Sequence, residues 1–327
     1  MENDQYTICD HTQVPDLARQ FTTLSNIAFG EYEGAMEADE AWSEWYLARP
    51  GTDPSLCQAA LVDGVMVSNV TVAVQPLQIG GKVILCGIID SVATHPDHRQ
   101  RGLARVLMER AHDAMQRIGG AEAAVLYTDP NNHPYQFYGR MGYETRARAM
   151  LLAGPRPGEG GCGPEVVAAD EMATELAELL NRYYTGYEGY APIDPGLWHW
   201  HKLSPPGGRR PTVVADLTGS GPFATASFVD ADLLLGDQRR TMSVACDIAA
   251  ADMNADRLGS LLGAAPSASV AMILDERAPE YGMAIQLGLE PQVEEVSMIL
   301  PFSDRARLVA AEHHGPWYVM VESVIGV

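Results

Sequence analysis

Lysine is almost absent from this chain of 327 residues. Lys82 and Lys202 are the only two, and arginine supplies the other formal positive charges. With 22 basic against 43 acidic residues, the formal net charge is −21. A surface of this charge repels nucleic acid and attracts cationic small molecules. The composition therefore argues against a nucleic-acid partner and is compatible with a small cationic ligand, although high charge also serves solubility alone.

Cysteine is scarce as well, and long apolar runs are missing. The five cysteines are odd in number, scattered, and show no C-x-x-C spacing. This argues against a zinc site or a disulfide framework and favours a reducing, cytoplasmic setting. No run of eighteen apolar residues occurs, so we expect no membrane-spanning helix. The acidic first residues, MENDQYTICD, are unlike a secretory signal.

What the chain does hold is a strand, a tight loop and a helix in unbroken order. The β-branched run from Val83 to Val92 is typical of a strand, and THPD at 94–97 ends it. A helical pattern follows, whose apolar positions recur at three- and four-residue spacing. These positions are Leu103, Val106, Leu107, Ala111, Ala114 and Ile118.

The loop before this helix favours an anion. The first N–H groups of a helix have no internal partners, and the helix dipole adds partial positive charge, so diphosphates bind there readily. Arg99, Arg101 and Arg105 add formal charge, and Gly102 permits close approach of a ligand to the backbone. The loop is neither a Walker loop nor a dinucleotide G-x-G-x-x-G, because it holds a single glycine without the following Lys-Ser/Thr.

The stretch VATHPDHRQRGLARVLM, at 92–108, resembles the acetyl-CoA-binding motif of the GNAT N-acetyltransferases. The resemblance implies acetyl-CoA as co-substrate. Its pantetheine arm would pair with the strand and its diphosphate would lie on the backbone N–H groups of the loop. A backbone N–H of the strand edge would polarise the thioester carbonyl. The implied cofactor-binding residues are Val92, Ala93, Thr94, Arg99, Gln100, Arg101, Gly102, Leu103, Ala104, Arg105 and Asn131.

A second motif lies at 129–144, DPNNHPYQFYGRMGYE. In the GNAT family, a helix here often starts with asparagine and carries a tyrosine seven residues later, before a Gly-aromatic pair. Asn131, Tyr138 and the pair at 142–143 fit this spacing, and Asn131 is suited to cap the helix. The resemblance implies that the Tyr138 hydroxyl protonates the departing thiolate as general acid. The alternative is a packed helix aromatic.

Acetyl transfer to an amine also needs a group that removes a proton. Asp90 lies two residues before Val92, hence on the same strand face, and is a candidate base. A buried structural aspartate is the alternative. Val327, through its terminal carboxylate, is a second candidate by resemblance only. We expect His199 and His201 to pack rather than to bind metal, because no third ligand lies nearby.

The acidic and aromatic stretch from Phe29 to Tyr46 lies where GNAT enzymes shape the acceptor pocket. Carboxylates beside Tyr32, Trp42 and Trp45 would suit a cationic amine through charge and ring faces. The alternative is an ordinary amphipathic helix with a solvated polar face. A small-molecule amine acceptor is therefore expected, and these patterns leave the oligomeric state, a homo-oligomer included, open.

The second half of the chain resembles a degenerate copy of the first. Aligning Gly288 with Gly142, an offset of 146, places Ala284 where Tyr138 stands. No R-x-x-G-x-A occurs in the segment 246–263. We therefore expect an α/β (α+β mixed sheet) chain with a tandem GNAT fold. Its parts would be a catalytic domain at 1–153, a Gly/Pro-rich linker at 154–163, a degenerate domain at 164–302 and a tail at 303–327.

This layout is similar to the enhanced-intracellular-survival-type subfamily, which acetylates amines of cationic compounds. Members of that subfamily carry a third domain whose final carboxylate reaches the active site. Here only 301–327 remain, which we expect to add a single extra strand. The expected activity is N-acetylation by direct attack on the thioester, because no cysteine lies within either motif. Two alternatives stay open: transfer of another acyl group from its CoA ester in natural-product tailoring, and a non-catalytic acyl-CoA sensor.

Overall fold

The computed structural model describes residues 5–30, 37–158, 163–219, 221–235, 238–312 and 315–321. The chain divides into two compact units. The first comprises residues 1–76, 83–126 and 300–310, and the second comprises 77–82, 127–299 and 311–327.

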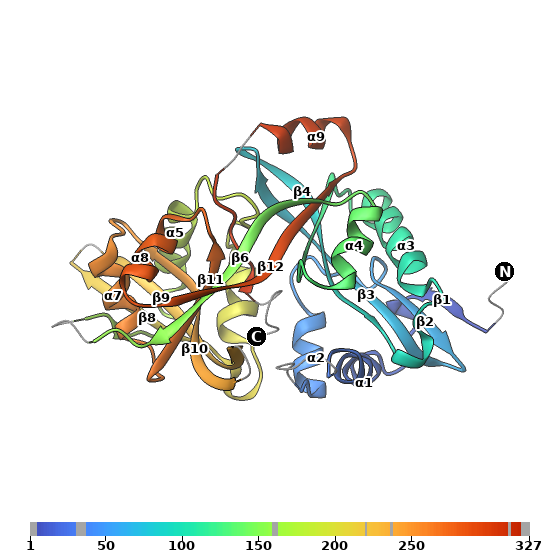
Figure 1. Ribbon diagram of the computed structural model, residues 1–327, viewed down its shortest axis with the longest axis horizontal. Coiled ribbons are helices and arrows are strands. Elements are labelled where there is room, and N and C mark those ends of the chain that lie inside the picture. The colour runs from blue at the N-terminus through green and yellow to red at the C-terminus, as the bar shows by residue number, and fades with distance from the viewer. Residues whose placement is uncertain are drawn as a thin grey trace. The chain divides into compact units, whose positions relative to one another are not determined.

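The first unit consists of a strand meander and the helices that flank it (Figure 1). Its elements in chain order are β1 (Thr7–Asp10), the 3₁₀ turn His11–Gln13, α1 (Leu17–Phe29), α2 (Glu40–Leu47), β2 (Gln58–Val62), β3 (Val65–Ile79), β4 (Lys82–Thr94), the 3₁₀ turn Pro96–His98, α3 (Leu103–Arg117), β5 (Ala123–Thr128) and α9 (Asp304–Ala311). The strands are ordered β1-β2-β3-β4-β5. Strand β5 pairs with β4 in parallel.

The β2–β3 hairpin follows from its turn residues. Asp63 and Gly64 both have positive φ, 50° and 81°, as a two-residue turn of the mirror-image type requires. The two strands pair in antiparallel register from Gln58 opposite Val70 to Val62 opposite Val65. The Asp-Gly turn therefore sets the register next to the turn, and an irregularity between Ala60 and Leu61 shifts it farther along β2.

Helix α3 buries a face that differs in part from the predicted one. Val106 and Ile118 are 42% and 61% exposed, whereas Met108 and Met115 are fully buried. Met115 lies against β4 at Gly87, where a Cβ would come 2.5 Å from the Met115 sulfur. The buried face thus turns toward the methionines, because glycine in β4 leaves room for them.

The second unit holds the remaining elements, also shown in Figure 1. They are α4 (His133–Arg140), β6 (Glu144–Pro155), β7 (Glu165–Val166), α5 (Ala173–Tyr183), α6 (Pro195–Trp198), the π-helical turn His199–Leu203, the 3₁₀ turn Gly207–Arg209, β8 (Thr212–Thr218), β9 (Gly221–Leu235), β10 (Gln238–Ala250), α7 (Ala255–Gly263), β11 (Ser269–Asp275), α8 (Pro279–Gln286) and β12 (Glu290–Pro301). The strands are ordered β12-β6-β11-β10-β9-β8-β7.

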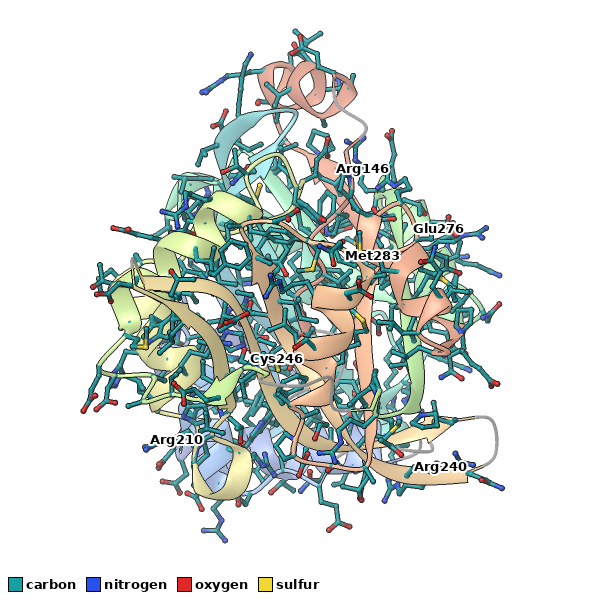
Figure 2. All side chains as sticks on the ribbon, turned by 90° about the vertical axis from the view of Figure 1, so that its left-hand side faces the viewer. Arg146, Arg210, Arg240, Cys246, Glu276 and Met283 are labelled. Atoms are coloured by element: carbon teal, nitrogen blue, oxygen red, sulfur yellow. The ribbon has the colours of Figure 1, made fainter. Side chains whose placement is uncertain are left out.

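Strand β6 lies between two strands that come much later in the chain. It pairs antiparallel with β11 on one side and with β12 on the other. Gly154 and Pro155, the first two residues of the expected linker, belong to β6, since they pair with Val270 and Ser269. Strands β9 and β10 form a long hairpin, with Arg240 near its outer end and Cys246 deeper in the unit (Figure 2).

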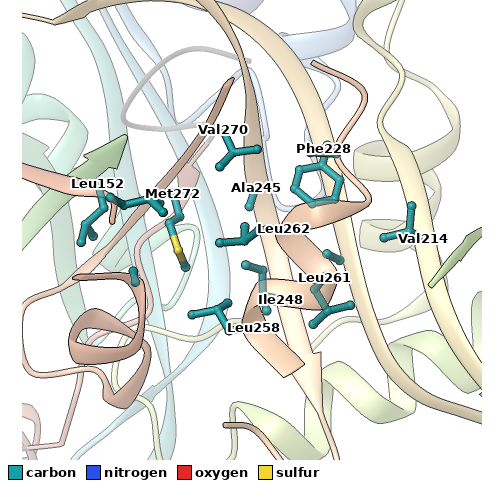
Figure 3. Packing of buried hydrophobic residues seen from close by; sticks show 14 of the residues in the cluster. Leu152, Val214, Phe228, Ala245, Ile248, Leu258, Leu261, Leu262, Val270 and Met272 are labelled. Atoms are coloured by element: carbon teal, nitrogen blue, oxygen red, sulfur yellow. The ribbon is translucent and has the colours of Figure 1, made fainter. Parts of the chain in front are cut away.

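The core of the second unit lies under helix α7. Its leucines Leu258, Leu261 and Leu262 are fully buried against the sheet, beside Ile248 and Phe228 (Figure 3). The leucines recur at three- and four-residue spacing, so one side of α7 is apolar. Burial of a leucine of this kind contributes roughly 1.5–3 kcal/mol.

The order of elements in 58–155 recurs in 212–301. Three strands, a helix, a strand, a helix and a strand appear in each, which we call the first and second repeats. The turn after the second helix matches in detail: Gly142 and Gly288 have φ of 94° and 87°. The N–H of the residue after each glycine donates to Tyr138 O and to Ala284 O, both at 3.1 Å. Ala284 therefore has the backbone position of Tyr138, as the offset predicted.

The expectation of a single extra strand after Pro301 is wrong for the part of the tail that is described. Helix α9 follows β12, and residues 315–321 form one isolated bridge, between Trp317 and Glu188. Trp317 packs on Gly189, where a Cβ would come 2.4 Å from the indole ring. In the described residues, every helix is too short or too polar to cross a membrane.

Candidate active site

The start of helix α3 is open to an anion. Gly102 precedes the helix with φ of 79°, and Gln100 also has positive φ, 61°. Within the described residues, no side chain caps α3, and its first turn holds no acidic residue. The N–H groups of this turn therefore have no competing side-chain acceptor. A Cβ on Gly102 would meet nothing within 4 Å, so there is open space directly beside this glycine.

The three arginines of the loop surround this helix start with positive charge. Arg99 Nε donates to Thr94 O at 3.1 Å, and Arg101 Nη2 donates to Asp97 O at 3.2 Å. Arg105 pairs with Glu109 at 2.8 Å, with side chains 64% and 55% exposed. An exposed pair of this kind is weak, so Arg105 is able to turn toward a phosphate at little cost. The loop residues fit a diphosphate.

Strand β4 extends beyond its ladder with β5. The parallel pairing joins Cys86, Gly87 and Ile88 to residues 123–125, and β4 continues to Thr94. Ser91 has φ of 46°, an unusual conformation for a residue other than glycine. A strand that bends and continues past its partner offers backbone groups to an extended ligand. The last part of β4 holds Val92, Ala93 and Thr94. It lies between the bend at Ser91 and residues 95–102, which we call the arginine loop.

Side chains of β3 hold the bent part of β4. Ser68 Oγ donates to Ala93 O at 2.9 Å, Asn69 Nδ2 to Ser91 O at 2.9 Å, and Thr71 Oγ1 to Asp90 O at 2.7 Å. These three polar side chains of β3 therefore donate hydrogen bonds to backbone carbonyls around the bend. The bonds stabilise a backbone that is otherwise strained at Ser91.

A buried histidine supports this arrangement. His11 is 3% exposed, and its Nε2 lies 2.7 Å from Asn69 Oδ1. Because Asn69 Nδ2 donates to Ser91 O, its Oδ1 accepts, and Nε2 carries the proton. Burial lowers the pKa of His11 to about 4. A neutral His11 thus fixes the Asn69 amide that holds the bend.

Asp90 faces a small pocket of the first unit, which Tyr46, Arg49 and Thr71 also line. Asp90 Oδ1 accepts from Ser91 N at 2.9 Å, and Oδ2 lies 3.8 Å from Arg49 Nη1. The Arg49 residue is only 5% exposed. Burial, followed by the charge of Asp90, raises the pKa of Tyr46 well above its ordinary value. The pocket therefore combines a carboxylate, a guanidinium and a protonated phenol.

The aromatic residues expected to receive a cation pack inside the protein instead. In α2, Trp42, Trp45 and Tyr46 are 5–7% exposed. Trp42 and Tyr46 stack at 4.9 Å between ring centroids, and Phe21 of α1 stacks on both. The rings of Phe21, Trp42 and Tyr46 thus use their faces to stack on one another. Tyr32 lies outside the described residues.

Tyr138 lies on α4 in the second unit and is 6% exposed. Its ring packs at 5.3 Å from Phe137 and 5.9 Å from Tyr143. The prediction that Asn131 caps this helix is wrong: the N-cap position belongs to Asn132, and Asn131 N donates to Asp129 Oδ1 at 2.8 Å. The aspartate forms a turn that moves the helix start by one residue.

Of the other candidate residues, the structure describes His201 but not Val327. Val327 lies outside the described residues, so its role as a base stays a prediction. His201 lies 3.9 Å from buried Asp247, and the described residues hold no metal-binding group of three ligands. Sequence reasoning missed Arg49, His11 and Asn69. Each is an isolated polar residue, without a spacing that would have pointed to the bend of β4.

Comparison with known families and structures gives one domain match and several likenesses of fold. A family model described as acetyltransferase (GNAT) domain matches residues 14–146. The comparison with curated proteins found no match.

Among solved structures, N-myristoyltransferase of Saccharomyces cerevisiae with bound myristoyl-CoA is 11% identical with a TM-score of 0.68, over 91% of this chain and 79% of that one. A GCN5-related N-acetyltransferase from Anabaena variabilis is 14% identical with a TM-score of 0.66, over 93% and 74%. A conserved protein of unknown function from Enterococcus faecalis is 12% identical with a TM-score of 0.67, over 93% and 74%. At these identities, the likeness shows the fold. The residues from 14 to 146, which include the bent strand and the arginine loop, are therefore the part of the chain that is similar to the acetyltransferase (GNAT) domain family.

Proposed function

We propose that the chain is an acetyl-CoA-dependent N-acetyltransferase that acts on the amine of a small, cationic molecule. The observation that carries the proposal is the open start of α3, directly after a strand that bends and outlasts its partner. The loop would hold the diphosphate through backbone N–H groups and Arg99, Arg101 and Arg105. Acetyl-CoA supplies a thioester as acetyl donor.

The residues of the chain then have distinct tasks. A backbone N–H of the β4 end, between Val92 and Thr94, would polarise the carbonyl. Tyr138 Oη would hold the proton that the departing sulfur takes. The proton of the amine would go to a base, for which Asp90 and the Val327 carboxylate are the two candidates. Direct attack is favoured, because the described cysteines are buried and lie outside both motifs.

The second repeat is proposed to be a degenerate GNAT fold that binds no cofactor. Asn254 caps α7 through its side chain, which accepts from Arg257 N at 2.9 Å, and Asp256 adds a negative charge to the first turn. Both features disfavour an anion there. Ala284, at the position of Tyr138, offers no proton. A tandem arrangement of the enhanced-intracellular-survival type would follow, cytoplasmic and with a small-molecule amine as its partner.

A longer acyl group is the second candidate donor. One observation favours it: the fold is shared with N-myristoyltransferase, whose structure contains myristoyl-CoA. Both donors would use the same diphosphate loop. The two donors differ in the length of the acyl chain that the protein must accommodate beyond the CoA sulfur.

The test combines binding with a panel of acceptors. We expect titration with acetyl-CoA to show one site per chain, and thiol release to appear with one class among aminoglycosides, polyamines, amino acids and peptides. Mass spectrometry of the product with acetyl-CoA and myristoyl-CoA identifies the donor. Binding without thiol release across the panel would favour an acyl-CoA sensor, and no binding at all would contradict the proposal.

A further inference from the structure

The two repeats each carry an aspartate at the same place beside the parallel strand pair. In the first repeat the ladder ends with Ile88 opposite Val125, and Asp90 lies two residues later. In the second, the corresponding ladder ends with Ala245 opposite Met272, and Asp247 lies two residues later. The strands are irregular there as well. Ser91 has positive φ, and the register of β10 shifts between Ala245 and Asp247.

Both aspartates have a buried basic partner from a helical segment that precedes the repeat. Arg49 follows α2 directly and lies 3.8 Å from Asp90. Lys202, in the π-helical turn, forms an ion pair with Asp247 and is 1% exposed. Burial favours protonation of Asp247, but Lys202 and His201 outweigh it, so the pKa of Asp247 lies below its ordinary range.

A tyrosine completes each group. The Tyr46 hydroxyl lies 3.2 Å from Ser91 Oγ and is close to Asp90. The Tyr318 hydroxyl donates to Asp247 Oδ1 at 2.8 Å. The same combination of acid, cation and phenol therefore occupies the end of the ladder in both units, although the segments that supply the phenols differ.

The second repeat serves as an internal comparison, because its helix start is unsuited to a diphosphate. Asn254 and Asp256 take the place of the arginine loop at the start of α7. The acid–cation–tyrosine group is nevertheless complete there. Its presence is thus independent of the acyl-CoA loop, which points to a role in shaping the strands.

We propose that Asp90 is a positioning residue and not the general base: paired with Arg49, it holds the Ser91 bend and so keeps the end of β4 open to the acyl-CoA arm. Asp90 Oδ1 accepts from Ser91 N–H, and Oδ2 lies 3.8 Å from Arg49 Nη1, within ion-pair distance but beyond hydrogen-bond distance. Accepting a proton would weaken both interactions. The inference rests on the proposed function and narrows it, since it leaves the proton to another group.

The test uses Asp90→Asn, Arg49→Gln, the double variant, and Asp247→Asn as the matched control. Each folded chain is titrated with acetyl-CoA and assayed for kcat/KM against pH with an accepted amine. We expect each single change at the Asp90 pair to weaken acetyl-CoA binding about tenfold, and the double variant to bind no more weakly than either single, since the two residues act together. D247N should lose thermal stability and keep the wild-type Kd.

The pH profile decides between positioning and proton transfer. A positioning role leaves the apparent pKa of the acidic limb unchanged in D90N. D90N with wild-type acetyl-CoA binding and a lost acidic limb would make Asp90 the base and overturn the inference. If D90N does not fold, the double variant, which buries neither charge, is read by the same criteria. Failure of the wild-type chain to bind acetyl-CoA contradicts the proposed function itself and is seen before any variant is compared.

Discussion

At the scale of single residues, the site depends on a few polar side chains that the helix and strand patterns do not mark. Asn69 joins buried His11 to the carbonyl of Ser91, the residue at which β4 bends. Asp90 and Arg49 lie on the other side of the same bend. The conformation of one strained residue is thus fixed from two directions, which is how an unfavourable φ persists in a folded protein.

Tyr138→Phe should lower turnover by roughly tenfold to a thousandfold while acetyl-CoA binding changes little, because only the hydroxyl proton is lost. The measurement is kcat with the best amine of the panel, alongside a titration. Tyr135→Phe is the matched control on the same helix, since the Tyr135 hydroxyl forms an exposed hydrogen bond with Thr145 Oγ1, at 3.1 Å. Equal turnover in the two variants would remove Tyr138 from the mechanism.

His11 should make the stability of the chain depend on pH. Its pKa is about 4 in the folded chain against 6.5 for an unperturbed histidine, because burial disfavours the charged form. The unfolded state therefore binds a proton first as the pH falls, and stability is full above pH 6.5 and lost toward pH 4. For this one group, the loss between pH 7 and pH 5 is about 2 kcal/mol.

Urea unfolding at both pH values measures this loss, and His11→Gln provides the comparison. We expect the difference between the two pH values to shrink by about 2 kcal/mol in the variant. An unchanged difference would show that His11 does not contribute to the acid sensitivity.

At the scale of elements, the start of α3 and the pairing of β6 with β11 and β12 matter most. Gly102→Ala introduces a left-handed alanine that meets no protein atom within 4 Å, so only about 1 kcal/mol of backbone strain is expected. Acetyl-CoA binding should weaken more than tenfold, since the Cβ would enter the space proposed for the diphosphate. Titration and thermal unfolding measure the two effects.

Gly81→Ala is the control for this prediction. Gly81 has φ of 68°, and a Cβ there also meets nothing within 4 Å, but it belongs to the β3–β4 turn. We expect a similar loss of stability and an unchanged Kd for acetyl-CoA. If G102A binds as tightly as G81A, the diphosphate does not approach Gly102.

The local elements were predictable because their signals are local. The apolar spacing of α3 and the single glycine of the loop before it each lie within about twenty residues, and the structure has these elements where they were expected. The exposed Val106 and Ile118 show the limit of this reasoning. Periodicity locates an apolar face only to within part of a turn, and the glycine at 87 decides which side packs on β4.

Pairings between distant residues were not predictable. Nothing in the residues of β6 marks β11 and β12 as its neighbours, because strands pair through main-chain hydrogen bonds, which do not depend on residue type. Arg49 is likewise an ordinary arginine until the fold brings Asp90 to it. The likeness of Asp90 to Asp247, on which the proposed positioning role of Asp90 rests, is a feature of the three-dimensional structure alone.

At the scale of the whole molecule, a fragment of residues 1–155 tests whether the first repeat is self-sufficient. Strand β6 is long and apolar, and both partner strands lie in 269–301. The fragment would therefore expose two unpaired edges of β6, and we expect it to aggregate. Size-exclusion chromatography beside the full chain measures this, and a soluble, monomeric fragment with a cooperative thermal transition would contradict the prediction.

The place of β6 between two later strands also constrains how such a chain can change over generations. A second repeat without a ligand of its own would ordinarily be free to shrink or disappear. Here its removal would leave β6, the strand after α4, without both of its neighbours, β11 and β12. This structural dependence gives the second repeat a reason to be retained whether or not it binds a ligand of its own.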